Sequence, residues 1–158
     1  PGAYPGIKAE ETGQGVAIAT NLREMSKLNV PIVAIITGEG CSGGALGLAV
    51  ADRVMMLEHA YYTVISPEGC ASILWRDAAR FADAAEALKI TSKDLLEFDI
   101  IDEEIAEPIG GAHTDYNIVA DNMKSAIMNA LDELSKKTPE VLKEERYNKF
   151  RKMGRFVE

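Results

Sequence analysis

Apolar side chains recur every three to four residues in two long stretches of the chain, which is the spacing of one face of an α-helix. The first stretch runs over residues 9–28, where Gly13 and Gly15 weaken the expected helix. The second is a long amphipathic stripe over residues 117–138. Pro139 then restarts the chain into a further helical segment.

Short runs of apolar and β-branched residues predict the strands. The run VPIVAIIT, residues 30–37, has the continuous apolar character of a strand buried on both faces. RVMMLEHA and YYTVIS, residues 53–66, predict a pair of short strands with a bend at His59 and Ala60. IIDEEIAE, residues 100–107, predicts a strand or an extended edge.

Three helices are expected between these strands and the long stripe. One starts after the capping residue Ser66 and runs toward Trp75, and a second spans residues 77–88. A third is capped by Thr91 or Ser92, and the loop PIGGAHTDY follows the last strand. Helices therefore alternate with strands and accumulate toward the C-terminal end, which indicates an α/β fold.

The glycine-rich segment TGEGCSGGALGLAVADRV, residues 37–54, matches two short motifs. Its GxGxxG, ending at Gly43, is the dinucleotide-binding fingerprint, and its GxSxG, centred on Ser42, is the nucleophile elbow of hydrolases. The helix expected next, GALGLAVA over residues 44–51, is shorter than either motif requires. His113 follows in the order that a serine hydrolase would need, but its place in a Gly-Gly loop favours a solvated or capping role.

A third interpretation needs only the backbone. The N–H groups of Gly43, Gly44 and Ala45 stand at the start of a helix, where they lack internal partners and the dipole is positive. Two such donors can stabilise an enolate-like oxygen, each by about 3 kcal/mol. Glycine allows a carbonyl to approach the backbone closely. A packing turn without chemistry remains the alternative.

Composition narrows the possible partners and sites. The 158 residues are enough for one domain, and the net charge of -8 argues against nucleic acid or an anionic membrane as partner. No run is apolar enough to span a membrane, so the protein is expected to be cytoplasmic. Two cysteines, Cys41 and Cys70, form neither a disulfide framework nor a zinc motif, and no metal site is expected.

Two features concern the ends of the chain. PGAYPG, residues 1–6, is a turn without a preceding element, so we expect the chain to continue from a strand of a longer polypeptide. The basic residues near the other end are interpreted as a solvated helix face; they are Arg146, Lys149, Arg151, Lys152 and Arg155.

Three strings carry a resemblance to a known family. PGAYPGIKAEETGQGVAIATNLREM, PIVAIITGEGCSGGALGLAVADRVMMLEHAYYTVISPEGCASILW and EPIGGAH closely resemble the alpha subunits of bacterial acetyl-coenzyme A carboxylase carboxyltransferases. The resemblance implies a crotonase-like (ClpP/crotonase) spiral of ββα units with additional C-terminal helices. Residues 1–158 would be the C-terminal part of a single crotonase-type carboxyltransferase domain whose N-terminal part is absent.

The resemblance also implies a reaction and partners. The family transfers a carboxyl group from carboxybiotin on a carrier protein to acetyl-CoA, which gives malonyl-CoA for fatty acid biosynthesis. The alpha chain would be active only with a beta subunit, in a heterotetramer of two alpha and two beta chains. The beta subunit would hold the zinc, and the biotin carboxyl carrier protein and biotin carboxylase would be further partners.

The family's site residues can be carried over to this chain as expectations. The N–H groups of Gly43, Gly44 and Ala45 would hold the ureido oxygen of biotin, and no side chain would act as general acid or base. Two turns would line the same cleft and bind substrate; their residues are Gly2, Ala3, Tyr4, Pro5 and Gly6, and Ser66, Pro67, Glu68 and Gly69. Plain helix capping is the alternative role for Ser66 and Glu68.

One departure and two rival functions complete the expectations. Cys41 stands where the family usually has glycine, so the turn would be strained if this residue were left-handed. An enoyl-CoA hydratase or isomerase of the same fold would need a glutamate beside the acyl chain, with Glu39 and Glu68 as candidates. An inactive fragment that only docks a partner through the helices from Asn117 onward is the other rival.

Overall fold

The strands form two small parallel sheets within residues 1–154, the part of the chain that this computed structural model describes. Strands β1 (Val33–Ile36), β3 (Arg53–Leu57) and β5 (Glu103–Ile105) make a three-stranded sheet in the order β1-β3-β5. Strands β2 (Glu39–Cys41) and β4 (Tyr61–Thr63) make the second sheet. In these sheets Val33 pairs with Arg53, and Glu39 pairs with Tyr61.

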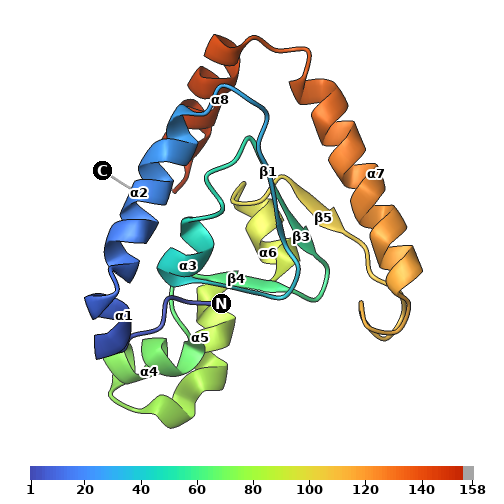
Figure 1. Cartoon of the computed structure of the whole chain (residues 1–158). Coiled ribbons are helices and arrows are strands. Elements are labelled where there is room, and N and C mark those ends of the chain that lie inside the picture. Colours follow the sequence, from blue (N-terminus) through green and yellow to red (C-terminus); the bar gives the residue numbers. More distant parts are fainter. Residues whose placement is uncertain (155–158) are drawn as a thin grey trace.

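The order of elements repeats along the chain. Strands β1 and β2 are followed by helix α3 (Ser42–Leu46), and strands β3 and β4 by helix α4 (Pro67–Trp75). The first strands of the two units pair in one sheet, the second strands pair in the other, and β5 adds the first strand of a further unit (Figure 1). Parallel stacking of equivalent strands is what a spiral of ββα units requires.

The structure adds detail to two sequence expectations. The run 53–66 forms the two predicted strands with a bend between them, and β3 and β4 join different sheets. The first predicted helix is divided into α1 (Ile7–Glu11) and α2 (Gln14–Lys27). The division falls at Gly13, whose φ of 80° is left-handed and favours glycine.

The remaining helices follow the predicted signals closely. Ser66 caps α4 by accepting the N–H of Gly69 at 3.1 Å, and Thr91, the first of the two candidates, caps α6. The segment predicted as 77–88 is a short 3₁₀ turn followed by a helix. The bounds are η1 (Ala78–Arg80), α5 (Phe81–Leu88), α6 (Ser92–Glu97), α7 (Tyr116–Leu134) and α8 (Pro139–Lys152).

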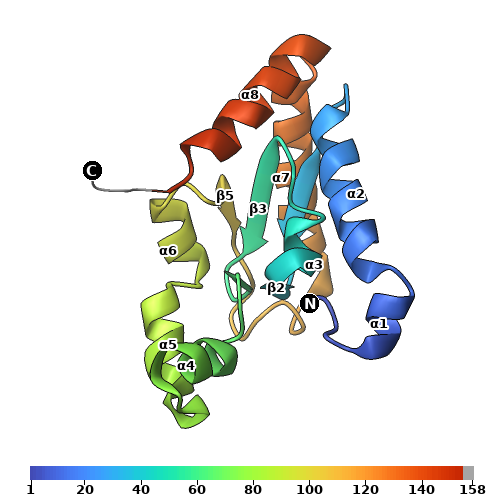
Figure 2. The same ribbon diagram turned by 90° about the vertical axis from the view of Figure 1, so that its left-hand side faces the viewer.

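The main hydrophobic core surrounds β3, the central strand of the larger sheet. Residues 54–57 of this strand are buried, and α7 covers β1 and β5 with the predicted apolar stripe (Figures 1 and 2). A second, smaller cluster of Cys70, Ala71 and Ala84 holds α4 against α5. None of the described helices is long and apolar enough to cross a membrane.

The prediction of a solvated basic face is wrong for Arg146. Its side chain is 2% exposed and makes two hydrogen bonds of 2.9 Å to the carboxylate of Asp52, which is 4% exposed. The same guanidinium donates to the carbonyls of Met25, Leu28 and Val30, near the end of α2. The buried charge is therefore paired, and it joins α8 to α2 and to the loop before β3.

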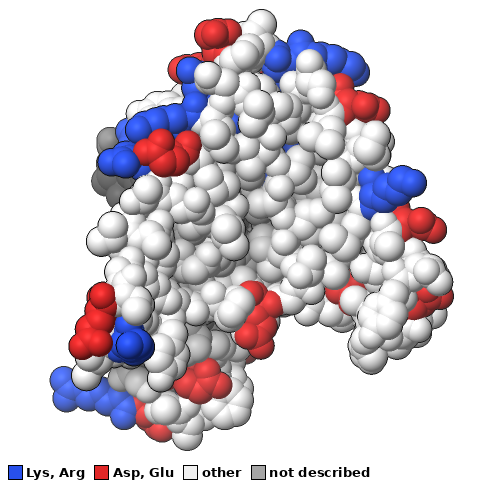
Figure 3. Space-filling view, viewed as in Figure 1, with Lys and Arg blue, Asp and Glu red and all other residues white. Residues whose placement is uncertain are grey.

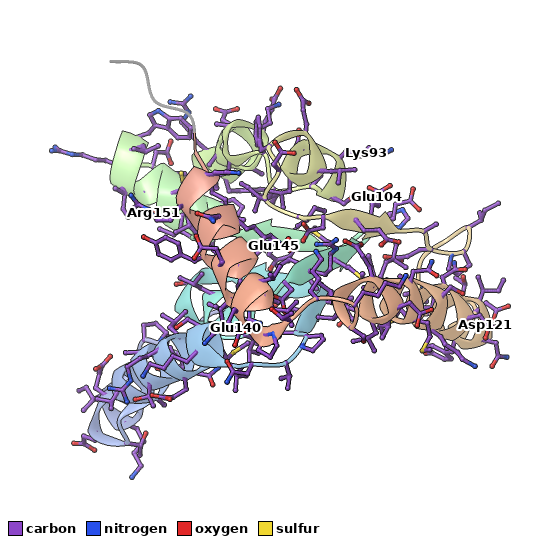
Figure 4. All side chains as sticks on the ribbon, turned by 90° about the horizontal axis from the view of Figure 1, so that it is seen from above. Lys93, Glu104, Asp121, Glu140, Glu145 and Arg151 are labelled. Atoms are coloured by element: carbon purple, nitrogen blue, oxygen red, sulfur yellow. The ribbon has the colours of Figure 1, made fainter. Side chains whose placement is uncertain are left out.

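Of the other basic residues in this segment, one forms an ion pair and two are exposed to solvent. Lys149 forms an ion pair with Asp102, whose carboxylate also accepts the N–H of Val54 at 2.7 Å, so the prediction is wrong for Lys149 too. Arg151 and Lys152 are exposed as predicted, and Arg151 lies near the end of α8 (Figure 4). Arg155 lies outside the described residues.

Candidate functional site

The glycine turn joins strand β2 to helix α3. Cys41 closes the strand with φ -140° and ψ 138°, which is ordinary extended backbone. The condition for strain at Cys41 is therefore not met. The left-handed residue is Ser42, with φ 54°, a conformation that costs a non-glycine residue about 1–2 kcal/mol.

Helix α3 is 5 residues long and, like every α-helix, presents free N–H groups at its start. In an α-helix that begins at Ser42, the N–H groups of Gly43 and Gly44 have no carbonyl one turn before them within the helix. In an ideal helix the Ala45 N–H would bond back to the Cys41 carbonyl. Among the described residues no such hydrogen bond forms, unlike the bond from Ala17 to Gly13 at the start of α2. At the other end, the N–H of Gly47 closes the helix on the Gly43 carbonyl at 2.9 Å.

The N-terminal residues pack directly on this turn. A Cβ on Gly44 would overlap the carbonyl oxygen of Pro1 and would lie 3.2 Å from the amide nitrogen of Ala3. A Cβ on Gly2 would lie 3.5 Å from the Cys41 Sγ atom. The structure therefore brings the predicted site residues Gly2 and Ala3 to the glycine turn, and it requires glycine at position 44.

The other residues of the N-terminal turn lie apart from the glycine turn. Tyr4 and Pro5 are exposed, and the Tyr4 ring packs on Gly6. The N–H of Gly6 donates to the Tyr4 carbonyl at 3.0 Å, so this part of the chain turns toward α1.

The predicted turn at residues 66–69 mainly caps helix α4. Ser66 accepts from Gly69, Pro67 is the first residue of α4, and Glu68 lies in the first turn of the helix. Residues 66–69 line neither of the two pockets beside the glycine turn.

Those two pockets lie on opposite sides of the glycine turn. The first, the Gly43 pocket, has a volume of about 380 Å³ and is lined by Ser42, Gly43, Leu46, Tyr62, Thr63, Val64, Leu88, Leu95 and Ile100. The second, the Gly44 pocket, has a volume of about 440 Å³ and is lined by Pro1, residues 34–40, Gly44, Ala45, Leu48 and Ala49. Apolar side chains predominate in both, as in sites that position a small molecule by a few polar groups.

Tyr61 and Tyr62 remain protonated near the turn at neutral pH. Burial raises the pKa of Tyr61, and the nearby carboxylate of Glu39 raises it further. Burial alone raises the pKa of Tyr62.

The middle of this face carries few charged side chains. Lys, Arg, Asp and Glu gather mostly at its edges, and the surface over α3 and the larger sheet is largely uncharged (Figure 3). Hydrogen bonds to a developing negative charge are stronger where mobile charge and water are kept away.

The histidines lie away from Ser42. His59 and His113 line a different pocket together with Glu107, whose carboxylate accepts the His59 N–H at 3.0 Å and the Ala112 N–H at 2.7 Å. Within the described residues neither imidazole is hydrogen-bonded to Ser42, so Ser42 has no histidine base. This arrangement argues against the serine-hydrolase interpretation.

The dinucleotide interpretation also conflicts with the structure. Gly40, the second glycine of that motif, lies inside strand β2 and is buried between Ile36 and Tyr62. The helix that follows is shorter than the one needed to cross a nucleotide-binding sheet. Among residues 1–154, no three His, Cys, Asp or Glu side chains are placed to hold a metal ion.

Sequence reasoning missed the side chains of α2 that pack against helix α3. Ile18 of α2 contacts Gly43 and Gly47, and the Asn21 amide donates to the Gly47 carbonyl. Asn21 is a polar residue on the apolar face of a helix, three residues after Ile18 and four before Met25. That interruption of the stripe was the available signal.

Comparison with known proteins identifies the family. The model of the family described as acetyl co-enzyme A carboxylase carboxyltransferase-like matches residues 1–154. The acetyl-coenzyme A carboxylase carboxyl transferase subunit alpha of Geobacter metallireducens is 61% identical over all of this chain. The corresponding protein of Thermus thermophilus is 55% identical, again over the whole chain. The chain spans 50% and 51% of the length of these relatives.

Solved structures with lower sequence identity share the fold. Transcarboxylase 12S has a TM-score of 0.69 at 20% identity, over 85% of this chain and 26% of its own. A Pseudomonas malonate decarboxylase hetero-tetramer has a TM-score of 0.65 at 15% identity, over 82% and 52%. Enoyl-CoA hydratase from Bacillus halodurans has a TM-score of 0.53 at 17% identity, over 85% and 52%.

These likenesses confirm the predicted crotonase-like α/β fold. The family match covers every described residue, including the glycine turn and the N-terminal segment packed on it. The chain therefore belongs to the acetyl co-enzyme A carboxylase carboxyltransferase-like family.

Proposed function

We propose that this chain forms the biotin-facing half of a carboxyltransferase site. The protein would transfer the carboxyl group of carboxybiotin, held on a carrier protein, to acetyl-CoA, which gives malonyl-CoA for fatty acid biosynthesis. The observation that carries the proposal is the family match over residues 1–154, in which the glycine turn offers two adjacent N–H groups.

The reaction requires the protein to stabilise a negative charge that develops on the ureido oxygen of biotin. When the bond between the biotin ring nitrogen and the carboxyl carbon breaks, its electrons remain on the ring, and the ureido oxygen becomes enolate-like. The N–H groups of Gly43 and Gly44 would donate to that oxygen and stabilise its negative charge. The methyl proton of acetyl-CoA is taken up by the biotin ring nitrogen, and the carboxyl carbon bonds to the methyl carbon.

Supporting residues would fix the donors in place. Ala45 lines the Gly44 pocket, and its N–H would be a third donor to the ureido oxygen. The Pro1 to Ala3 backbone packs on Gly44 and limits movement of the turn. Glu68 and the start of α4 would close the edge of the cleft. Positioning and charge stabilisation then supply the catalysis, without a general base from a side chain.

The proposed partners follow from this division of the site. A beta subunit, the zinc-bearing chain, would supply the acetyl-CoA side of the cleft, in an assembly of two alpha and two beta chains. The biotin carboxyl carrier protein would bring carboxybiotin from biotin carboxylase to the site, in the cytoplasm.

The test is a carboxyl-transfer assay with the full-length protein, with and without the beta subunit. We expect malonyl-CoA to form only when both subunits are present, and acetyl-CoA to be preferred to longer acyl-CoA substrates. Transfer by the alpha chain alone would contradict the divided site. A complex that assembles but transfers nothing would favour the docking-only alternative.

One observation favours the hydratase alternative. Glu39 lines the Gly44 pocket, so a carboxylate does stand beside the glycine turn. Hydration of crotonyl-CoA by the same preparation, lost in Glu39→Gln, would support that alternative. The carboxyltransferase proposal predicts no such hydration.

A further inference from the structure

Helix α3 cannot fix its own orientation. It has 5 residues, and helices much shorter than about 12 residues are unstable in isolation. The directions of the Gly43 and Gly44 N–H groups must therefore be set by what α3 packs against. Besides strand β2, which leads into it, α3 packs against the Pro1 to Ala3 backbone and against helix α2.

The contact with α2 has an apolar part and a polar part. A Cβ on Gly43 would lie 3.6 Å from the Ile18 Cδ1 atom, and one on Gly47 would lie 3.6 Å from the Ile18 Cγ2 atom. The side-chain amide of Asn21, one turn further along α2, donates to the carbonyl of Gly47. Ile18 thus supports the middle of α3, and Asn21 holds its C-terminal end.

The hydrogen bond from Asn21 is directional, whereas the Ile18 contact is not. In the described part of the chain, no other side chain donates a hydrogen bond to a carbonyl of residues 42–47. The Asn21 amide nitrogen also lies 3.3 Å from the Met25 sulfur, which restricts its rotation. Within the described residues, this amide therefore makes the side-chain hydrogen bond that ties the end of α3 to α2.

We infer that Asn21 is a positioning residue for the oxyanion site: by holding the Gly47 carbonyl, it aims the N–H groups at the opposite end of α3. The inference rests on the proposed function, because it assigns a task to Asn21 only if those N–H groups stabilise charge. Asn21 contacts α3 at Gly47, whereas the Pro1 to Ala3 segment packs on Gly44. Asn21 lines neither pocket, so it acts on substrate only through the helix.

The chain offers a matched control at another place. Asn122 on α7 donates from the same amide nitrogen to a backbone carbonyl, that of Ala106, at 2.9 Å. Replacement of either asparagine by alanine removes one amide-to-carbonyl hydrogen bond, which is part-buried at Asn21 and exposed at Asn122. Only Asn21 contacts α3. A purely structural role predicts similar effects of the two replacements on activity.

The experiment compares Asn21→Ala and Asn122→Ala in the full-length protein assembled with the beta subunit. The assay runs in reverse, with malonyl-CoA and free biotin as the probes. We expect Asn21→Ala to lower kcat by about 10- to 100-fold, part of the effect of losing an oxyanion donor, with KM for malonyl-CoA changed less than about threefold. Asn122→Ala should keep kcat within about twofold.

A second variant guards against a folding defect. Asn21→Asp places a carboxylate oxygen against the Gly47 carbonyl, so it should lower kcat further than Asn21→Ala in complexes that still assemble. Equal kcat values for Asn21→Ala and Asn122→Ala in an active assembly would overturn the assignment of Asn21 and leave the proposed function intact. A wild-type assembly that transfers no carboxyl group would overturn the proposed function itself.

Discussion

Gly43 and Gly44 are neighbours with different constraints. At Gly43 an added Cβ would make an ordinary contact with Ile18, at 3.6 Å. At Gly44 it would overlap the backbone of Pro1, and backbone atoms move less easily than the end of a side chain. Gly44 is thus the residue at which the strand, the short helix and the N-terminal segment meet, and its replacement disturbs all three.

Glu107 provides a prediction about pH. Its side chain is 4% exposed, and although burial opposes ionisation, the N–H groups of His59 and Ala112 and the nearby His59 ring hold its pKa below the usual value of 4.5. A carboxylate with a lowered folded pKa contributes stability above its unfolded pKa and loses it as pH falls through the folded value. Glu107 should therefore stabilise the fold at neutral pH and contribute to unfolding in acid.

The variant Glu107→Gln should lower the free energy of unfolding at pH 7 by about 2 kcal/mol, since hydrogen bonds to a buried charge are lost. Its stability should also fall less steeply than that of the wild type below about pH 4.5. Denaturant unfolding between pH 3 and pH 7 measures both effects, with Glu97→Gln, an exposed carboxylate on α6, as the control. Parallel pH profiles for wild type and Glu107→Gln would contradict the assignment.

Single residues could be predicted where their effect is local. Ser66 and Thr91 cap their helices as expected because a cap depends on neighbours within three residues. Arg146 could not be predicted, because its partner Asp52 lies 94 positions away in the sequence. Ser42 was also missed as the left-handed residue, since the turn's direction depends on where β2 ends.

At the level of elements, Arg146 of helix α8 holds the C-terminal end of α2. Water does not compete for the Arg146 guanidinium, because its side chain is buried. Its hydrogen bonds go to Asp52 and to three backbone carbonyls. Those carbonyls belong to the end of α2 and the chain just after it, where a helix lacks internal partners. The Ile32 N–H donates to Asp52 at 2.7 Å and ties β1 to the same network.

Removal of one partner from this buried pair should be costly. Arg146→Met should lower the free energy of unfolding by about 3–5 kcal/mol, because it leaves Asp52 charged and unpaired in the interior. Arg151→Met, on the exposed side of the same helix, should change it by less than about 0.5 kcal/mol. Denaturant titration measures the free energy of unfolding of both variants. Similar losses would show that the buried pair of Arg146 and Asp52 adds no stability.

The pattern of apolar residues predicted most elements but not their partners. Helical spacing located α2, α7 and α8, and β-branched runs located β1, β3 and β4. The sequence did not indicate strand partners, because β3 and β4 are neighbours in sequence yet join different sheets. The helix after the glycine turn was predicted to reach Ala51 but ends at Leu46; the chain then turns so that Asp52 reaches Ile32.

The whole molecule presents large apolar side chains on several separate helices. Ile7 on α1 is 80% exposed and Val64, before α4, is 74% exposed. Single exposed apolar side chains are common on folded proteins, and only a contiguous patch marks a contact face. The chain spans about half the length of the relatives it matches. The resemblance, rather than the apolar pattern, predicted the crotonase-like fold.

The most direct test of the account is the rate of carboxyl transfer by Ser42→Ala and Gly44→Val in the assembled complex. The backbone mechanism predicts that Ser42→Ala keeps kcat within about threefold of the wild type, because no step uses its hydroxyl. Gly44→Val should lower kcat by more than about 100-fold, since the new side chain displaces the N–H donors, while the complex still assembles. An inactive Ser42→Ala complex beside an active Gly44→Val complex would contradict the account and return the chemistry to the serine.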